Sequence, residues 1–184
     1  MSYLIEDQFT GTSGGAGVGG GFIQKVAQTF TASNAYTIAR VGLKLKAFDE
    51  NNTINGAIYS TSAGVPNSSL RTFTIEANSG AFGTTYALLN SPLEISEGTV
   101  YAIVLTSPVS PTFVQWSDNI ITGTPYDGGQ GYWYVVNDPT FGTTWLVANQ
   151  DRHFIIFSEY SLSPTPSHEA TGTILFPTLS WVVD

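Results

Sequence analysis

The chain has 184 residues, of which 42% are hydrophobic, 13% aromatic and only 11% charged, which suits one domain with a sizeable core. Its net charge is −8, and its six basic residues form no cluster, which excludes nucleic acid and anionic membrane surfaces as expected partners. The chain has no cysteine for disulfides or thiolate metal sites, and no apolar stretch approaches the roughly 20 residues of a membrane span.

Residues 1–21 are predicted to form an N-terminal Gly-rich arm. Within it, Tyr3, Leu4 and Ile5 suit a short strand, and residues 10–21 (TGTSGGAGVGGG) have the composition of a flexible linker. A phosphate-binding loop is not indicated, because neither a Lys-Ser/Thr pair nor a helical pattern follows the glycines. The N-terminus also lacks the basic and apolar regions of a standard secretory signal.

The core is predicted over residues 22–163, as strands separated by turns. Residues 41–47 alternate strictly between apolar and other side chains, which is the period of a half-buried strand. Residues 100–105 are almost continuously apolar, as in a strand covered on both faces. The expected strands span residues 26–31, 36–48, 54–59, 71–76, 84–89, 93–95, 100–105, 113–116, 132–136, 145–147 and 153–160. This pattern predicts an all-β, jelly-roll-like antiparallel β-sandwich.

Residues 164–184 form a predicted C-terminal arm. Pro164 and Pro166 interrupt the strand pattern, but residues 171–183 are apolar and β-prone. We expect this segment either to complete a sheet of its own domain or to pack on a neighbouring subunit, because alone it would expose too much apolar surface. The assembly contacts are predicted to come from apolar residues of both arms: Tyr3, Leu4, Ile5, Ile174, Leu175, Phe176, Leu179 and Trp181.

Motifs for catalysis and metal binding are weak. His153 lies two residues after Asp151, but this spacing indicates only the end of a strand, and no pair of carboxylates stands out as a glycosidase pair. Acidic and amide residues gather in turns such as 49–52, where calcium can bind, but these residue types also favour turns for backbone reasons. We therefore predict no catalytic residues, no metal site and no cofactor.

Residues 131–137 (GYWYVVN) carry three consecutive aromatic side chains. On a strand, Tyr132 and Tyr134 share one face and Trp133 lies on the other. The favoured interpretation is that these rings belong to the core and to a subunit interface. The alternative is a sugar-binding surface, in which flat rings stack on a sugar and polar groups bond its hydroxyls. The candidate residues for that alternative are Tyr126, Asp127, Tyr132 and Tyr134.

Six segments follow one another in an order typical of one family. They are AQTFT (27–31), YTIARVGLKL (36–45), INGAIYSTSAGVPNSSL (54–70), PLEISEGTVYAIVLT (92–106), VQWS (114–117) and the GYWY…TTW hairpin (131–145). Through them the core resembles the choice-of-anchor type of extracellular β-sandwich domain. The resemblance implies a jelly-roll-like module without defined catalytic residues. The chain departs from the family at residues 137–145, where relatives often have a shorter Asp-Gly-Gly-Ser-Thr-Trp turn.

Modules that resemble this one occur on bacterial surface proteins and in phage virion proteins. Together with the missing secretory signal, the resemblance implies a structural protein at the virion surface, either a capsid decoration or cement protein or a fibre-like component. The expected partners are further copies of the chain, most simply in a homotrimer, and other virion proteins of the capsid or tail. The alternative function is a carbohydrate-binding module that adheres to cell-surface glycan.

Overall fold

The computed structural model describes residues 2–10, 14–18, 23–48, 52–106, 113–120 and 126–160. Over these ranges the chain forms strands, and none of them contains a helix that could span a membrane. The strands are β1 (Ser2–Phe9), β2 (Gly14–Val18), β3 (Ile23–Thr31), β4 (Tyr36–Ala47), β5 (Asn52–Ser62), β6 (Val65–Ala77), β7 (Gly83–Ile95), β8 (Val100–Thr106), β9 (Val114–Ile120), β10 (Gly131–Asp138), β11 (Gly142–Ala148), β12 (Gln150–Arg152) and β13 (Phe154–Tyr160).

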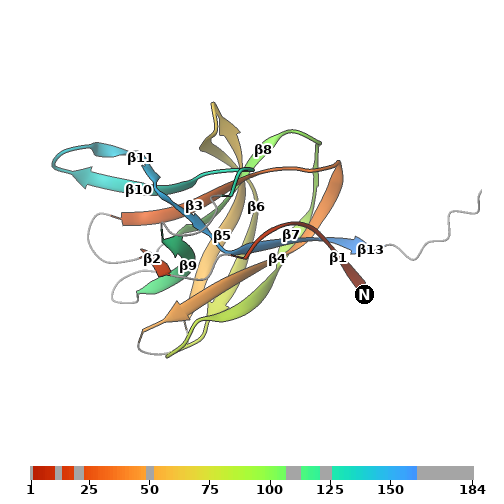
Figure 1. Ribbon diagram of the computed structural model, residues 1–184, viewed down its shortest axis with the longest axis horizontal. Helices are drawn as coiled ribbons and strands as arrows, with labels where there is room; N and C mark the ends of the chain where they lie inside the picture. Colours follow the sequence, from red (N-terminus) through yellow and green to blue (C-terminus); the bar gives the residue numbers. More distant parts are fainter. Residues whose placement is uncertain are drawn as a thin grey trace, which may run out of the picture.

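The strands form two antiparallel sheets that pack face to face (Figure 1). The six-stranded sheet has the order β11-β10-β3-β8-β5-β6. The seven-stranded sheet has the order β1-β13-β4-β9-β12, with β7 paired to β4 and β2 paired to β9. From β3 onward the chain passes repeatedly from one sheet to the other, as in a jelly roll. The predicted all-β antiparallel sandwich is therefore confirmed.

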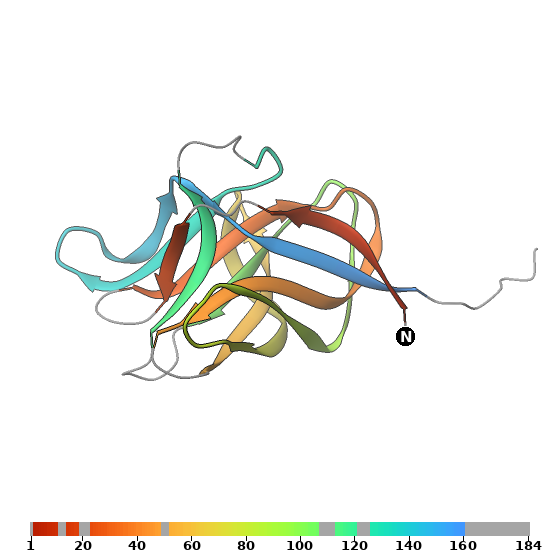
Figure 2. The ribbon, with the colours of Figure 1, turned by 60° about the horizontal axis from the view of Figure 1, so that its bottom comes forward.

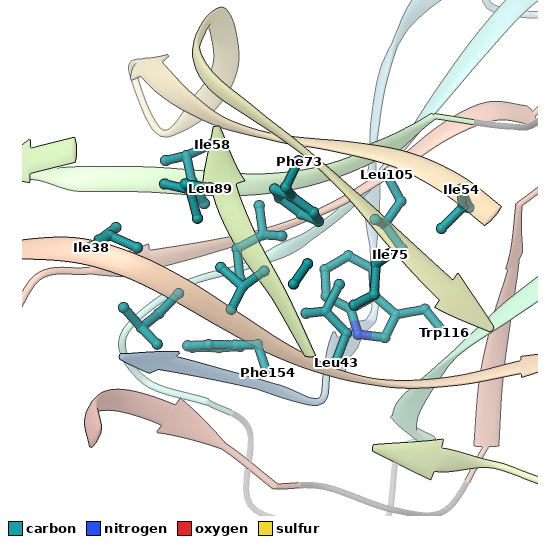
Figure 3. Packing of buried hydrophobic residues seen from close by; sticks show 14 of the residues in the cluster. Ile38, Leu43, Ile54, Ile58, Phe73, Ile75, Leu89, Leu105, Trp116 and Phe154 are labelled. Carbon is teal, nitrogen blue, oxygen red and sulfur yellow. The ribbon is translucent and has the colours of Figure 1, made fainter. Parts of the chain in front are cut away.

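The core lies between the two sheets and follows the alternation of the strands. In β4, Val41, Leu43 and Leu45 point inward and are fully buried, as the strict alternation of residues 41–47 predicts. Trp116 from β9 and Phe73 from β6 fill the centre of the same cluster (Figure 3). Each such side chain contributes roughly 1.5–3 kcal/mol through removal of its apolar surface from water. This core supports the outer faces of both sheets.

Much of the segment predicted as an arm over residues 1–21 belongs to a sheet, including the short strand expected at Tyr3, Leu4 and Ile5. Ser2–Phe9 pairs with β13 and Gly14–Val18 pairs with β9, so both segments are strands of the seven-stranded sheet. Figure 2 shows β1 running beside β13. The frequent glycines of residues 10–21 favoured the prediction of a linker. In the structure, Gly15 lies against the ring of Phe82 and Gly17 against the ring of Phe113, where a side chain would not fit. The C-terminal arm at 164–184, with Ile174, Leu175, Phe176, Leu179 and Trp181, lies outside the described residues.

Candidate functional site

The aromatic run on β10 divides between the two faces of the six-stranded sheet. Trp133 and Val135 point inward, where Val135 is buried and Trp133 packs against the central core. Tyr132 and Tyr134 point outward and both contact Trp145. The prediction that Tyr132 and Tyr134 share one face and Trp133 the other is therefore confirmed. The outward pair belongs to the β10–β11 hairpin, which extends from the body of the molecule in Figure 1.

Cross-strand pairing places a tryptophan and a lysine on either side of Tyr134. Trp145 is its partner on β11, with the two ring centroids 5.0 Å apart, and Lys25 is its partner on β3. The Lys25 ammonium lies 5.3 Å from the Tyr134 ring centroid and 5.9 Å from that of Tyr59 on β5. Both distances are within the range of cation–π attraction. We call this surface the Lys25 face: Lys25, Tyr59, Tyr132, Tyr134 and Trp145.

The rings of the Lys25 face cover small side chains. Ala27, Ala102 and Val104 point outward from β3 and β8, yet they are buried in a second apolar cluster with Tyr132. Burial also raises the pKa of Tyr132 above that of a free phenol. The face is thus a packed cluster on the outside of the sheet, unlike the isolated apolar residues common on protein surfaces.

Polar side chains continue the cross-strand row that contains Lys25. The register carries this row through Thr106 on β8, Asn55 on β5 and Thr74 on β6. The row contains hydroxyl and amide groups but no acid. Within the part of the chain that the structure describes, Lys25 has no carboxylate partner, and its contacts are the two tyrosine rings.

The structure does not bring the four predicted sugar-site residues together. Tyr126 packs on the rings of Phe9 and Phe154, at 5.6 and 5.3 Å, and its ring adjoins the core between the sheets. Asp127 is exposed in the turn before β10. Only Tyr132 and Tyr134 share a surface, because the turn that follows Tyr126 separates it from the alternation of β10.

Three residues of the Lys25 face escaped the sequence analysis: Lys25, Tyr59 and Trp145. The sequence alternation of β3 is enough to predict that Lys25 lies on the face opposite Val26. The strand order that places β5 and β11 on either side of β3 and β10 could not be predicted, because sheet neighbours are set by tertiary pairing.

A second cation lies on aromatic rings on the outer face of the seven-stranded sheet. The guanidinium carbon of Arg40 lies 4.1 Å from the ring centroid of Tyr86 on β7. It is also 5.2 Å from the Tyr3 ring and 5.4 Å from the Phe157 ring. With the neighbours that continue its cross-strand row, this cluster forms what we call the Arg40 face: Tyr3, Ile5, Arg40, Tyr86, Leu88 and Phe157.

The Arg40 face is apolar and open to solvent at its margins. Ile5 is 54% exposed, Leu88 60% and Tyr86 47%. Tyr86 lies across Gly42, where a Cβ atom would come within 2.9 Å of its ring. Of the assembly residues predicted in the N-terminal segment, Tyr3 and Ile5 are on this face. Leu4 points to the opposite side of β1 and is 47% exposed.

A buried polar cluster joins the two sheets at one end of the sandwich. Arg152, which is fully buried, donates from Nη1 to the carbonyl of Ala27 at 2.7 Å. The side-chain amide of Gln28 donates to Asp151 at 3.1 Å and accepts from the backbone N–H of Arg152 at 2.7 Å. Asp118 is the cross-strand partner of Arg152 and is fully buried. No sequence pattern predicted the burial of Arg152 and Asp118, since Asp and Arg are usually exposed.

Burial shifts the pKa values of Asp118 and Arg152 toward their neutral forms, and the opposite charges within the cluster counteract this shift. Burial raises the pKa of Asp118, and the positive charge of Arg152 offsets only part of that increase. Burial lowers the pKa of Arg152 to about 10, while Asp118 and Asp151 act in the opposite direction. The cluster is closed to solvent, so we interpret it as a structural tie between the sheets.

Neither a metal centre nor a known family accounts for these surfaces. Within the described ranges, no three His, Asp or Glu side chains gather in a way that could hold a metal ion. The chain matches no model of a known protein family, and no curated protein matches its sequence. The two outer faces are therefore the candidate functional surfaces of the described residues.

Proposed function

We propose that this protein is a structural component of a phage virion surface, a capsid decoration, cement or fibre-like protein that works through assembly contacts. The observation that carries the proposal is the exposed apolar surface of the Arg40 face. Contiguous apolar surface on a folded domain is typical of sites that bind other proteins. Arginine stacked on aromatic rings suits such a site, because the guanidinium is weakly hydrated and is enriched at interfaces.

The position of the Arg40 face adds to this proposal. Tyr3 and Ile5 belong to β1, which is the last strand at its end of the seven-stranded sheet among the described strands. An edge strand offers unpaired backbone groups beside the apolar side chains, so a partner can gain both kinds of contact. The proposed partners are further copies of the chain, most simply in a homotrimer, and other virion proteins of the capsid or tail.

The test is to place charge on the Arg40 face and to measure the mass of the soluble assembly. The double variant Ile5→Asp/Leu88→Asp is expected to dissociate an oligomer that the natural chain forms, as measured by sedimentation velocity. Thr74→Asp is the matched control, because Thr74 is exposed on the outer face of the other sheet. A natural chain that is monomeric and does not bind virion particles in co-sedimentation would contradict the proposal.

A second candidate function is carbohydrate binding, which the Lys25 face favours. Aromatic rings on a sheet surface can stack on the C–H faces of sugars, and nearby Thr and Asn groups can bond hydroxyls. Tyr134→Ala is expected to weaken binding on a glycan array, whereas Tyr86→Ala on the Arg40 face is expected to leave it unchanged. Equal binding by both variants would rule the Lys25 face out as the sugar site.

A further inference from the structure

We propose that the ligand of the Lys25 face is an acidic glycan, in which the carboxylate of a uronic or sialic acid pairs with the Lys25 ammonium. This inference rests on the second candidate function, carbohydrate binding, and assigns the chemical class of the sugar. The face supplies one positive charge and a set of aromatic rings, and the cross-strand row beside it supplies the neutral polar groups of Thr106, Asn55 and Thr74. That combination matches a ring-shaped ligand with hydroxyls and one negative charge.

The ammonium of Lys25 is available to an anionic ligand. No described carboxylate pairs with Lys25. Its ammonium lies beside the rings of Tyr59 and Tyr134, where an ammonium would otherwise favour an anion. An ammonium is a compact, strongly hydrated charge, and rings on its flanks displace part of its hydration shell. A ligand carboxylate can restore the lost interactions through a charge-assisted hydrogen bond.

The overall charge of the chain does not attract an acidic ligand. With a net charge of −8, the protein as a whole repels anions at long range. A charge this far from neutral makes general attraction of an acidic ligand unfavourable, so its binding requires a specific local cation. Screening limits the repulsion to about 8–10 Å at physiological ionic strength, which leaves a contact with Lys25 favourable.

The geometry of the rings indicates a sugar as the carrier of the carboxylate. Tyr134 and Trp145 meet at 57°, so the two ring planes are inclined to each other and neither is stacked flat on the other. Lys25 and Thr106 are cross-strand partners, and adjacent strands lie about 4.8 Å apart, comparable to the width of a pyranose ring. A sugar over this row would thus have Lys25 for its carboxylate and Thr106 for a hydroxyl within about one ring width of each other. Phosphate groups fit less well, since they are usually held by several Arg or Lys groups or by backbone amides.

Matched pairs of acidic and neutral sugars test this inference by titration calorimetry. The probes are trigalacturonate with its methyl ester, and 3′-sialyllactose with lactose. The natural chain is expected to bind at least one acidic probe about tenfold more tightly than its neutral counterpart, as expected for one charged hydrogen bond. Lys25→Met keeps most of the side-chain stem and is expected to abolish that difference. Lys44→Met, on the outer face of the other sheet, is the control and is expected to preserve it.

The outcomes separate failure of the inference from failure of the proposed function. Equal affinity for acidic and neutral probes, unchanged in Lys25→Met, would overturn the inference while supporting carbohydrate binding. Absence of binding to all four probes and to the glycan array would overturn the inference together with the carbohydrate-binding proposal. The assembly proposal depends on the Arg40 face and is unaffected by either result. Thermal unfolding of Lys25→Met, expected to match that of the natural chain within a few degrees, excludes a loss of folding as the cause.

Discussion

The two outer faces of the sandwich use the same motif with different surroundings. On each face a cation lies on aromatic rings, Lys25 against two tyrosines and Arg40 against three rings. The cross-strand row of Lys25 continues into threonine and asparagine, whereas that of Arg40 runs from Ile5 to Leu88. The cross-strand row is therefore apolar on both sides of Arg40, whereas on one side of Lys25 it is polar.

The difference shows that a cation on aromatic rings does not specify a function by itself. A guanidinium can remain stacked and be covered by another protein at modest cost, because it is planar and weakly hydrated. An ammonium has a strong demand for hydration or for an anion, so covering it with apolar surface is costly. The type of cation and its neighbours together favour a protein partner on one face and a small polar ligand on the other.

Both faces depend on the same scaffold, and removal of its buried cation is expected to disable them together. Arg152→Ala would leave Asp118 and Asp151 buried without their positive partner, which typically costs about 3–5 kcal/mol. We expect this loss in the free energy of unfolding by urea denaturation, with Arg152→Lys destabilised less because it keeps the charge. A loss for Arg152→Ala of less than about 1 kcal/mol, the usual value of a surface pair, would contradict the role of this cluster as a tie.

A substitution beneath Tyr86 is expected to disturb one face only. Gly42→Val would insert a side chain where even a Cβ atom lies 2.9 Å from the Tyr86 ring, so Tyr86 must move away from Arg40. Overpacking of this kind costs about 1–3 kcal/mol. Self-association measured by sedimentation is expected to weaken, while glycan binding by the Lys25 face is expected to remain. Parallel loss of both activities would show that the faces are not independent.

The strengths of the two cation–π clusters are expected to differ. Arg40→Met is expected to lower the free energy of unfolding by about 0.5–1 kcal/mol, and Lys25→Met by less, because Arg40 contacts three rings and approaches one of them to 4.1 Å. Chemical denaturation of both variants beside the natural chain measures the difference. The reverse order would indicate that the Lys25 cluster is the more tightly packed of the two.

Alkaline pH is expected to lower stability through Tyr126, whose ring adjoins the core between the two sheets and belongs to neither outer face. Burial, then the charges of Asp7 and Asp151, raises the pKa of Tyr126 to about 12, against 10 for an unperturbed phenol. Between these values the unfolded state loses the phenol proton first, so stability falls as pH rises from about 10 to 12. Tyr126→Phe is expected to show a shallower decline in its melting temperature over this range. An identical decline in both proteins would place the alkaline sensitivity elsewhere.

Local pattern accounts for much of what could be predicted here. Alternation in residues 41–47 identified the inward face of β4, and the same rule separated Trp133 from Tyr132 and Tyr134. The type of fold also followed, because short alternating segments without helical period leave a sandwich as the simplest way to bury one face of each strand. These features depend on residues close together in the chain.

Sheet order, and everything that it brings together, was decided only by the tertiary structure. Lys25, Tyr59 and Trp145 come from three distant segments of the chain. They share one face only because the strands pair in the order β11-β10-β3-β8-β5. The same is true of Arg152 and Asp118, whose burial no local pattern indicates. Long-range pairing depends on the summed packing of both sheets, whereas strand alternation depends on the backbone geometry of a few residues.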